Sequence, residues 1–371
     1  MNIGVIIMLV LISETMHAQN NPNLNSLTPS VISAYYSLDV PVDARSVAMG
    51  ESFVAVGGTS SVHIYNPASL ASAHGVTVSY NRRGYTFIDP VVAKYQSVSA
   101  SMYTSLVSVG LFYSRYDFDD HIAITTPSGT GSGITSYSYV WGVTLARTFG
   151  EHFHLGVTGK TFNFGGTFGS SATNSTNNAM LFDVGVQYSA RVIFVDDVFR
   201  DELRGGISLQ NFGTDLRQGS MLLYDPQQLV PVPRYLRIGF AYRIERLPER
   251  EDELMPFSML VSGEYRNLLN PGSGQEDSKD FWGFGTELSF FEIASARTGV
   301  YIAPFDRWYG RRGEASFRYG LGLNIPLRHI AEIPWSAKFD YSVIPIIVSS
   351  NGFHDSFPVF SVEVQYLEDI F

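Results

Sequence analysis

The sequence predicts an all-β fold, a transmembrane antiparallel β-barrel of the outer-membrane type with about fourteen strands. Three observations carry this prediction. Stretches of about ten residues alternate between apolar and polar side chains, and the connections between them alternate between long and short. Charged residues make up only 16% of the chain and aromatic residues 14%, which suits a surface that faces lipid.

The period-two alternation is clearest in residues 179–192. Met180 and Phe182 fall on one face of a strand, whereas Asp183 and Gln187 fall on the other. A half-buried sheet of a soluble protein alternates as well, but these apolar faces are rich in aromatic residues and no amphipathic helix is present to cover them. The predicted strands are 76–81, 93–104, 107–116, 136–149, 153–164, 179–192, 203–212, 233–244, 256–267, 281–290, 293–303, 315–325, 335–343 and 357–366.

The predicted connections average about fourteen residues at one end of the strands and about six at the other. Residues 117–135 and 213–232 are examples of the long class, and residues 105–106 and 150–152 are examples of the short class. Long outside loops and short periplasmic turns are typical of outer-membrane barrels, and an even strand number lets the sheet close without an unpaired edge in lipid.

The N-terminal residues 1–18 are predicted to be a secretory signal peptide. Their apolar run, residues 3–12, is too short to cross a bilayer as a helix, and Ala18 is an acceptable residue before a cleavage site. The chain contains no cysteine, which excludes a disulfide framework, thiol chemistry and lipoprotein anchoring. We expect residues 19–75 to form a small unit of their own and residues 76–371 to form the barrel.

Within residues 19–75, local signals predict two short helices. Asp43 can cap a helix that runs through Met49, and Gly50 can end it with a positive φ. Asn66 before Pro67 is a second helix start, since proline suits the first helical position. Residues 52–56 between the two helices read as a short apolar strand. Such a piece cannot form a core alone, so it must dock into something larger.

The same stretch carries a resemblance to a known family. The sequence Asp-Ala-Arg-Ser-Val-Ala-Met-Gly-Glu-Ser-Phe-Val-Ala-Val, followed by Asn-Pro-Ala-Ser-Leu-Ala, resembles the N-terminal hatch of the FadL/PorV/PorQ superfamily of outer-membrane barrels. Glu51 and Ser69 stand where the family usually has glycine. Residues 31–41 look more like the PorV/PorQ branch than the fatty-acid-porin branch. The matching positions are Ala44, Arg45, Ala48, Met49, Gly50, Phe53, Ala55, Val56, Asn66, Pro67, Ala68, Leu70 and Ala71. The resemblance implies that residues 19–75 plug the lumen as a hatch.

The inward faces of the predicted strands carry charges of both signs, which can pair across the lumen and hold a hatch in place. We hypothesise that Arg45 pairs with one of the lumenal carboxylates. A polar lumen also disfavours a wide apolar channel. The predicted lumenal polar residues are Asp183, Arg191, Arg237, Arg243, Glu264, Arg266, Lys338, Asp340 and Glu363.

Signatures of catalysis and cofactor binding are weak. Residues 130–133 form a glycine-rich stretch without the Lys-Ser/Thr ending of a phosphate loop. Residues 119–121, in a solvated loop, and His152 with His154 offer metal-ligand types without a suitable arrangement. We therefore expect no cofactor, no metal and no enzyme, although a hydrolase with Ser and His on neighbouring strands stays an alternative. The net charge of −10 argues against nucleic-acid binding.

One outside loop carries a group of arginine and aromatic residues. Arginine beside aromatic rings can grip the phosphates of lipopolysaccharide or a protein partner. The alternative is an interfacial aromatic girdle with surface arginines, which the pattern favours. The residues are Arg307, Trp308, Tyr309, Arg311 and Arg312.

The resemblance implies two functions in the outer membrane of a Gram-negative bacterium. A PorV/PorQ-like protein is a non-enzymatic component of type IX secretion that binds exported proteins. A FadL-like protein is a passive transporter of long-chain fatty acids or other hydrophobic compounds. Residues 31–41, the long loops and the polar lumen favour the first. An apolar crevice inside the barrel would favour the second.

Overall fold

The fold is a closed antiparallel barrel, as the strand pattern predicts. The computed structural model describes residues 38, 43–57, 61–86, 92–104, 106–125, 131–168, 177–192, 198–217, 229–230, 232–250, 253–270, 280–302, 305–306, 311–312, 315–348 and 353–367. The predicted signal peptide, residues 1–18, lies outside these ranges. Within the described ranges, no helix has the length and hydropathy needed to cross a membrane.

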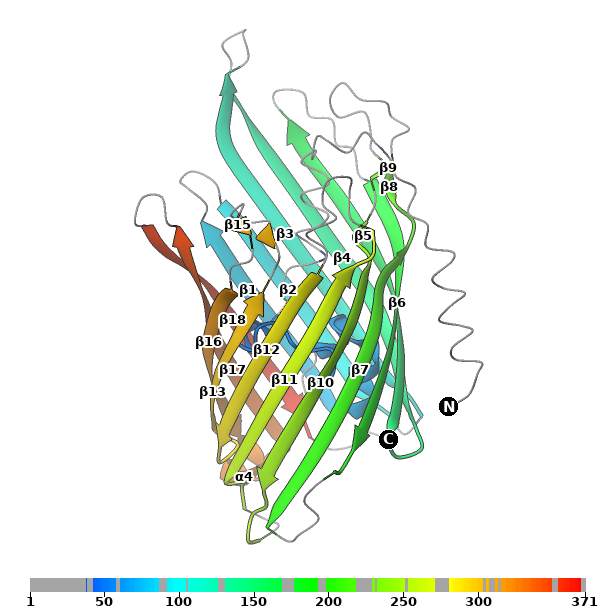
Figure 1. The fold of residues 1–371 in the computed structure, drawn as a ribbon, viewed down its shortest axis with the longest axis vertical. Coiled ribbons are helices and arrows are strands. Elements are labelled where there is room, and N and C mark those ends of the chain that lie inside the picture. Colours follow the sequence, from blue (N-terminus) through cyan, green and yellow to red (C-terminus); the bar gives the residue numbers. More distant parts are fainter. Residues whose placement is uncertain are drawn as a thin grey trace.

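All fourteen predicted strands are present. They are β1 (Val76–Thr86), β2 (Val92–Tyr103), β3 (Ser108–Thr125), β4 (Gly131–Phe149), β5 (Phe153–Phe168), β6 (Asn177–Ala190), β7 (Phe199–Gly213), β10 (Tyr235–Arg246), β11 (Phe257–Leu268), β12 (Asp280–Phe290), β13 (Ala294–Ile302), β16 (Ala315–Pro326), β17 (Trp335–Val348) and β18 (Phe353–Tyr366). Each pairs with its neighbours along the chain, and the tilted wall is seen in Figure 1.

The barrel closes where β1 pairs with both β2 and β18. Val76 lies opposite Met102 on one side and opposite Tyr366 on the other. The start of the first strand and the end of the last therefore lie at the same end of the barrel. Closure gives every barrel strand two neighbours, which a sheet needs in order to sit in lipid.

The long outside loops predicted from sequence are partly strand. Residues 117–135 are predicted as one loop, but within them residues 117–125 continue β3 and residues 131–135 belong to β4, with Asp119 opposite Thr135 and Thr125 opposite Gly131. Backbone pairing above the membrane needs no apolar face, so the alternation that marks a strand in lipid is missing there. Residues 213–232 contain the small sheet of β8 (Leu216–Arg217) and β9 (Leu229–Val230). The residues 119–121 thus belong to a strand.

The opposite end of the barrel has the tighter connections. One of them holds α4 (Leu327–Ala331), a single helical turn at the lower end of the barrel in Figure 1. The upper end carries β8, β9, β14 (Phe305–Asp306) and β15 (Arg311–Arg312).

The outward face of the wall is apolar, with the phase that the sequence predicts. Val184 is 51% exposed, Phe240 48% and Leu321 65%, although each belongs to a regular strand. Large exposed side chains on a closed barrel form the lipid-facing surface. The buried residues of this barrel therefore lie at the inward positions of the strands.

Candidate functional site in the lumen

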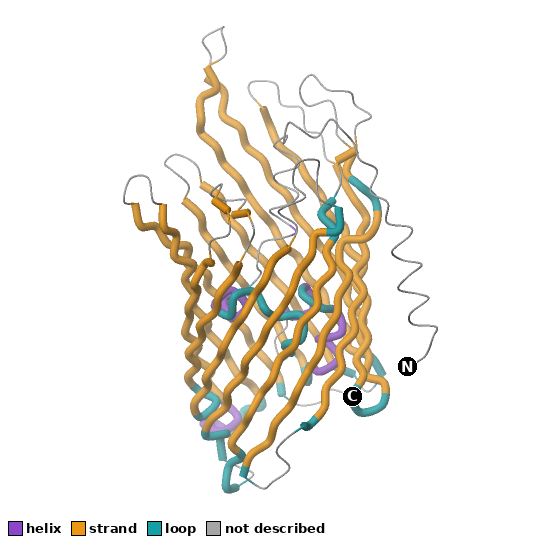
Figure 2. The backbone as a smooth tube through the Cα atoms, in the orientation of Figure 1, coloured by secondary structure: helices purple, strands orange, loops and turns teal. Residues whose placement is uncertain are grey.

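A short stretch of chain crosses the interior of the barrel at mid-height (Figure 2). We call residues 43–57 and 61–73 the internal segment. It consists of α3 (Ala44–Ala48), the 3-10 helices η1 (Val62–Ile64) and η2 (Pro67–Ser72), and the turns between them. Helix α3 contacts β16, β17 and β18, whereas η2 contacts β4, β5 and β6. The segment therefore touches the wall on two sides.

The helix starts of the internal segment follow the local signals. Asp43 caps α3, since its Oδ1 accepts from Ser46 N at 2.8 Å, and Gly50 takes a φ of +65° after the helix. Asn66 caps η2 through its Oδ1, which accepts from Ala68 N at 3.0 Å, and Pro67 occupies the first position. The caps and the contacts with the wall stabilise these short helices.

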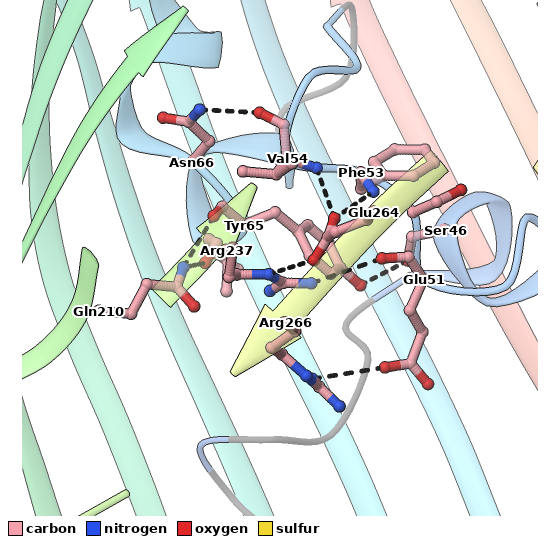
Figure 3. A network of polar contacts seen from close by, with 12 residues as sticks. Ser46, Glu51, Phe53, Val54, Tyr65, Asn66, Gln210, Arg237, Glu264 and Arg266 are labelled. Atoms are coloured by element: carbon pink, nitrogen blue, oxygen red, sulfur yellow. Dashed lines mark hydrogen bonds and ion pairs between the residues drawn. The ribbon is translucent and has the colours of Figure 1, made fainter. Parts of the chain in front are cut away.

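The short strand predicted for residues 52–56 is wrong. The backbone turns there, and the amides of Phe53 and Val54 both donate to Oε2 of Glu264 at 2.8 Å. The carbonyl of Val54 accepts from Asn66 and Gln187. Because side chains of the wall and of Asn66 within the segment satisfy these backbone groups, no strand partner is required. Figure 3 shows Glu264 and Asn66 holding this turn.

Glycines in the wall let the backbone of the internal segment come close. A Cβ added at Gly283 of β12 would lie 2.3 Å from the carbonyl oxygen of Gly50, and one added at Gly156 of β5 would lie 2.3 Å from the carbonyl carbon of Pro67. Any other residue would push the segment away from the wall at these two points. Glycine at these two wall positions is thus required for the observed position of the segment.

The first cluster of charges ties α3 to the wall. Arg45 donates from Nε and Nη2 to the two carboxylate oxygens of Glu287, each at 2.7 Å. Arg297 donates to Glu287 and to Asp340, each at 2.5 Å. Arg45 therefore has a lumenal carboxylate partner, as hypothesised. This partner, Glu287, is absent from the predicted lumenal set.

The second cluster holds the turn after α3. Arg237 donates from Nε to Oε1 of Glu264 at 2.5 Å and stacks on Tyr65, with 4.8 Å between Cζ and the ring centroid. Glu51 accepts from Arg318 and lies 3.7 Å from Arg266. Figure 3 shows Arg237 and Arg266 reaching from the wall toward the segment. The first cluster pairs a charge of α3 with the wall and the second does the same for the turn after it, which fixes the segment in one position.

The other predicted lumenal residues, except Arg191, form separate ion pairs within the wall. Asp183 pairs with Lys160 at 2.6 Å within the wall, and Lys338 pairs with Glu363 at 3.1 Å. Arg243 is half-buried and lies 3.6 Å from Glu245. The lumenal placement of Arg191 is wrong, because this residue follows the end of β6 and is exposed. The alternation continues in the sequence past the point where the strand ends.

Among the charged lumenal residues that are absent from the predicted set, four pair with Asp183 or belong to the two clusters. Each of them has the inward phase of its strand, opposite to exposed residues such as Trp282 and Phe284. The alternation along each strand could therefore have identified these residues from the sequence. The four residues are Lys160, Glu287, Arg297 and Arg318.

The lumen is not polar throughout, and this corrects the expectation from sequence. Near the end with the long connections, inward side chains form a buried cluster that we call the apolar cluster. Ile64 of the internal segment and Leu38 pack against it. At this level, strands such as β6 are apolar on both faces, with Ala179 and Leu181 inward and Met180 and Phe182 outward, so polarity alone cannot reveal their inward phase. The cluster consists of Phe112, Val140, Phe162, Phe164, Ala179, Leu181, Leu216, Val232, Tyr235, Leu268 and Phe281.

Other predicted positions contribute less to the site. Arg307, Trp308 and Tyr309 lie outside the described residues, and only the backbone of Arg311 and Arg312 is described, as β15. His154 faces inward between Thr148 and Ser189, at 2.9 and 3.3 Å. Among the residues that the structure describes, no group of three His, Asp or Glu side chains is close enough to hold a metal ion.

Comparison with solved structures finds barrels of the same kind. The deltaS2 mutant of the monoaromatic hydrocarbon channel TodX is 9% identical, with a TM-score of 0.50, over 89% of this chain and 99% of that one. A Pseudomonas aeruginosa FadL homologue is 12% identical, with a TM-score of 0.48, over 88% and 99%. The toluene transporter TodX of Pseudomonas putida is 10% identical, with a TM-score of 0.47, over 87% and 96%. No protein-family model and no curated protein sequence matches the chain. At such low identity the likeness shows the fold.

The closed wall and its apolar outer surface decide the location. A barrel with this architecture crosses the outer membrane of Gram-negative bacteria, with its aliphatic and aromatic side chains in lipid. The internal segment and the apolar cluster then lie one above the other in the path across the membrane.

Proposed function

We propose that the chain is a passive conduit for apolar small molecules across the outer membrane, with the internal segment as its gate. The observation that carries the proposal is the apolar cluster inside the barrel, between the long connections and the internal segment. Inward aromatic and aliphatic side chains have no role in a water-filled pore, whereas they suit an apolar ligand. The conduit needs no catalytic step and no cofactor.

The gate follows from how the internal segment is attached. Ile64 of the segment packs against the apolar cluster, and charged contacts from Arg45 and Glu51 fix the segment to the wall. An apolar molecule that enters the cluster has to displace these contacts in order to pass. In the proposed mechanism the ligand moves down its concentration gradient, and the segment returns to its place afterwards.

The similar solved barrels supply the probe for a test. TodX is named for monoaromatic hydrocarbons and toluene. We expect the purified chain to bind toluene, and Phe162→Asn to weaken this binding at least tenfold because Phe162 is fully buried in the apolar cluster. Thr158→Asn, a polar inward change on the same strand but outside the cluster, should leave toluene binding unchanged.

A second candidate is the secretion role, a PorV/PorQ-like component of type IX secretion that binds exported proteins. The likeness of residues 31–41 to that branch favours it, and the loop arginines 307, 311 and 312 would contact the partner or lipopolysaccharide. Purification from the native outer membrane in mild detergent, with mass spectrometry of bound molecules, separates the two. Stoichiometric exported proteins or periplasmic secretion partners would overturn the conduit, whereas bound fatty acids or other apolar molecules would support it.

A further inference from the structure

We propose that Arg266 and Arg318, the arginine pair, form a binding site for a carboxylate carried on an apolar body, and that Glu51 of the internal segment occupies this site. The inference rests on the proposed conduit and names a class of molecule for it. In this state the protein's own carboxylate closes the site, and an external carboxylate competes with Glu51 for the arginine pair.

The backbone of Glu51 is the first observation. Glu51 has a φ of +61° directly after Gly50 at +65°, so two consecutive residues are left-handed. A residue with a side chain is disfavoured in this region, and glycine is the residue that adopts it freely. A glutamate at this position is strained, and its side-chain contacts have to compensate for that strain.

The contacts of Glu51 supply the compensation. Its Oε1 accepts from Nη1 of Arg318 on β16, and its Oε2 lies 3.7 Å from Nη1 of Arg266 on β11. The three side chains are only 6–7% exposed. The arginines belong to the wall, whereas Glu51 belongs to the internal segment. If the segment withdraws, two buried guanidinium groups stay behind and need another anion.

Arg318 has an unused donor at this point. Within the described residues its Nε is buried and has no hydrogen-bond partner. A guanidinium presents its nitrogens as a planar fork that matches the two oxygens of a carboxylate. Glu51 accepts only from Nη1, whereas Nε lies on another edge of the guanidinium. A ligand carboxylate that is free to orient itself can approach the edge that carries Nε.

Aromatic rings connect the arginine pair to the apolar cluster. Arg266 lies over Phe281 and Tyr235, with 4.6 and 5.2 Å between Cζ and the ring centroids, and both rings belong to the cluster. Arg318 lies 4.6 Å over Tyr301, which packs against the cluster. A ligand held by its carboxylate therefore has apolar surface within reach for the rest of its body.

The space at this point explains why the site is closed. A cavity of about 10 Å³ lies between Glu51, Arg266, Phe281 and Tyr301, which is room for about one water molecule. An organic carboxylate does not fit beside the side chain of Glu51. It has to replace it.

Benzoate is the probe for the test, since it joins a carboxylate to an aromatic ring. Its binding to the purified full-length chain in detergent is measured by calorimetry for the wild type, Glu51→Gln and Glu51→Gly. The first variant removes the charge and keeps the left-handed backbone, and the second also removes the strain. We expect both variants to bind benzoate at least tenfold more tightly than the wild type. Glu245→Gln neutralises a carboxylate that pairs with Arg200 within the wall, and should match the wild type.

The arginine pair is tested in the opened background. Adding Arg318→Gln to Glu51→Gly should abolish the gain in benzoate affinity. Equal affinity for benzoate in the wild type and both Glu51 variants would overturn the inference, and so would a gain that Arg318→Gln leaves intact. An equal gain for acetate would overturn the requirement for an apolar body. Toluene binding is measured in parallel: if it persists while benzoate fails, the carboxylate site is overturned and the conduit is not.

Discussion

Arg45 and Glu287, 242 residues apart in sequence, join the internal segment to the wall with two parallel hydrogen bonds of 2.7 Å. A two-bond arginine–carboxylate pair fixes direction as well as distance. The side chains are 10% and 8% exposed, so water contributes little to their solvation. This pair anchors the start of the internal segment to β12 and is the natural first target for mutation.

Arg45→Ala should loosen the internal segment and raise the ion conductance of the barrel in planar bilayers. Glu287 keeps Arg297 as a partner, so we expect a stability loss of about 3 kcal/mol, at the lower end of the cost of breaking a buried ion pair. Arg115→Ala removes an exposed pair with Asp117 and serves as the control. A conductance of Arg45→Ala equal to that of the control would show that this pair does not hold the gate.

Gly283→Ala should displace the turn at Gly50 from the wall. The added Cβ would lie 2.3 Å from the Gly50 carbonyl oxygen, and this backbone atom cannot move without moving the segment. We expect a destabilisation of about 1–3 kcal/mol, as for overpacking in a core. Hydrogen exchange of residues 49–53, read by mass spectrometry, should increase. Gly84→Ala is the matched control, since nothing lies within 4 Å of its Cβ, and comparable exchange in the two variants would refute the close approach.

Glu264→Gln should release the turn at residues 53–54. The carboxylate accepts both amide hydrogens through one oxygen and also pairs with Arg237. Hydrogen bonds to a charged group contribute about 1.5–3 kcal/mol each, and a neutral amide accepts more weakly. We expect the protection of the Phe53 and Val54 amides to fall at least tenfold. Glu245→Gln, whose partners lie in the wall, should leave it unchanged, and undiminished protection in Glu264→Gln would contradict the role of the carboxylate.

Asp43→Asn should stabilise α3 at neutral pH. Burial raises the pKa of the Asp43 carboxyl from 3.8 to about 6, and Asp340 adds to this rise, whereas Ser46 and Arg45 oppose it. Because the folded state binds the proton more tightly, stability from this group is present below about pH 4 and is lost as the pH rises through 6. The full cost at pH 7 is about 3 kcal/mol for a shift of two pKa units.

The measurement is hydrogen exchange of residues 44–49 between pH 4 and 7, corrected for the intrinsic rate. Asparagine remains a good N-cap, so Asp43→Asn keeps the bond to Ser46 and removes the buried charge. The wild type should lose protection across this range and the variant should not. Asp117→Asn, an exposed carboxylate, is the control. A flat profile for the wild type would rule out an uncompensated charge at Asp43.

The sequence by itself determined the barrel, the phase of its clearest strands and the helix caps of the internal segment. A strand turns alternate side chains to opposite faces, so Phe182 and Leu321 could be assigned to lipid, and Glu264 and Arg266 to the lumen, without a structure. The sequence also predicted the helix caps at Asp43 and Asn66 and the left-handed backbone of Gly50. Each depends on neighbours within a few residues.

The tertiary structure decided which groups meet inside the barrel. Pairing of Arg45 with Glu287 and of Glu51 with Arg318 depends on how the closed wall places distant strands around the segment, which no local pattern encodes. The apolar cluster was hidden for a related reason. Where a strand is apolar on both faces, the period-two signal vanishes, and only the closed sheet shows that Leu181 and Phe281 point inward.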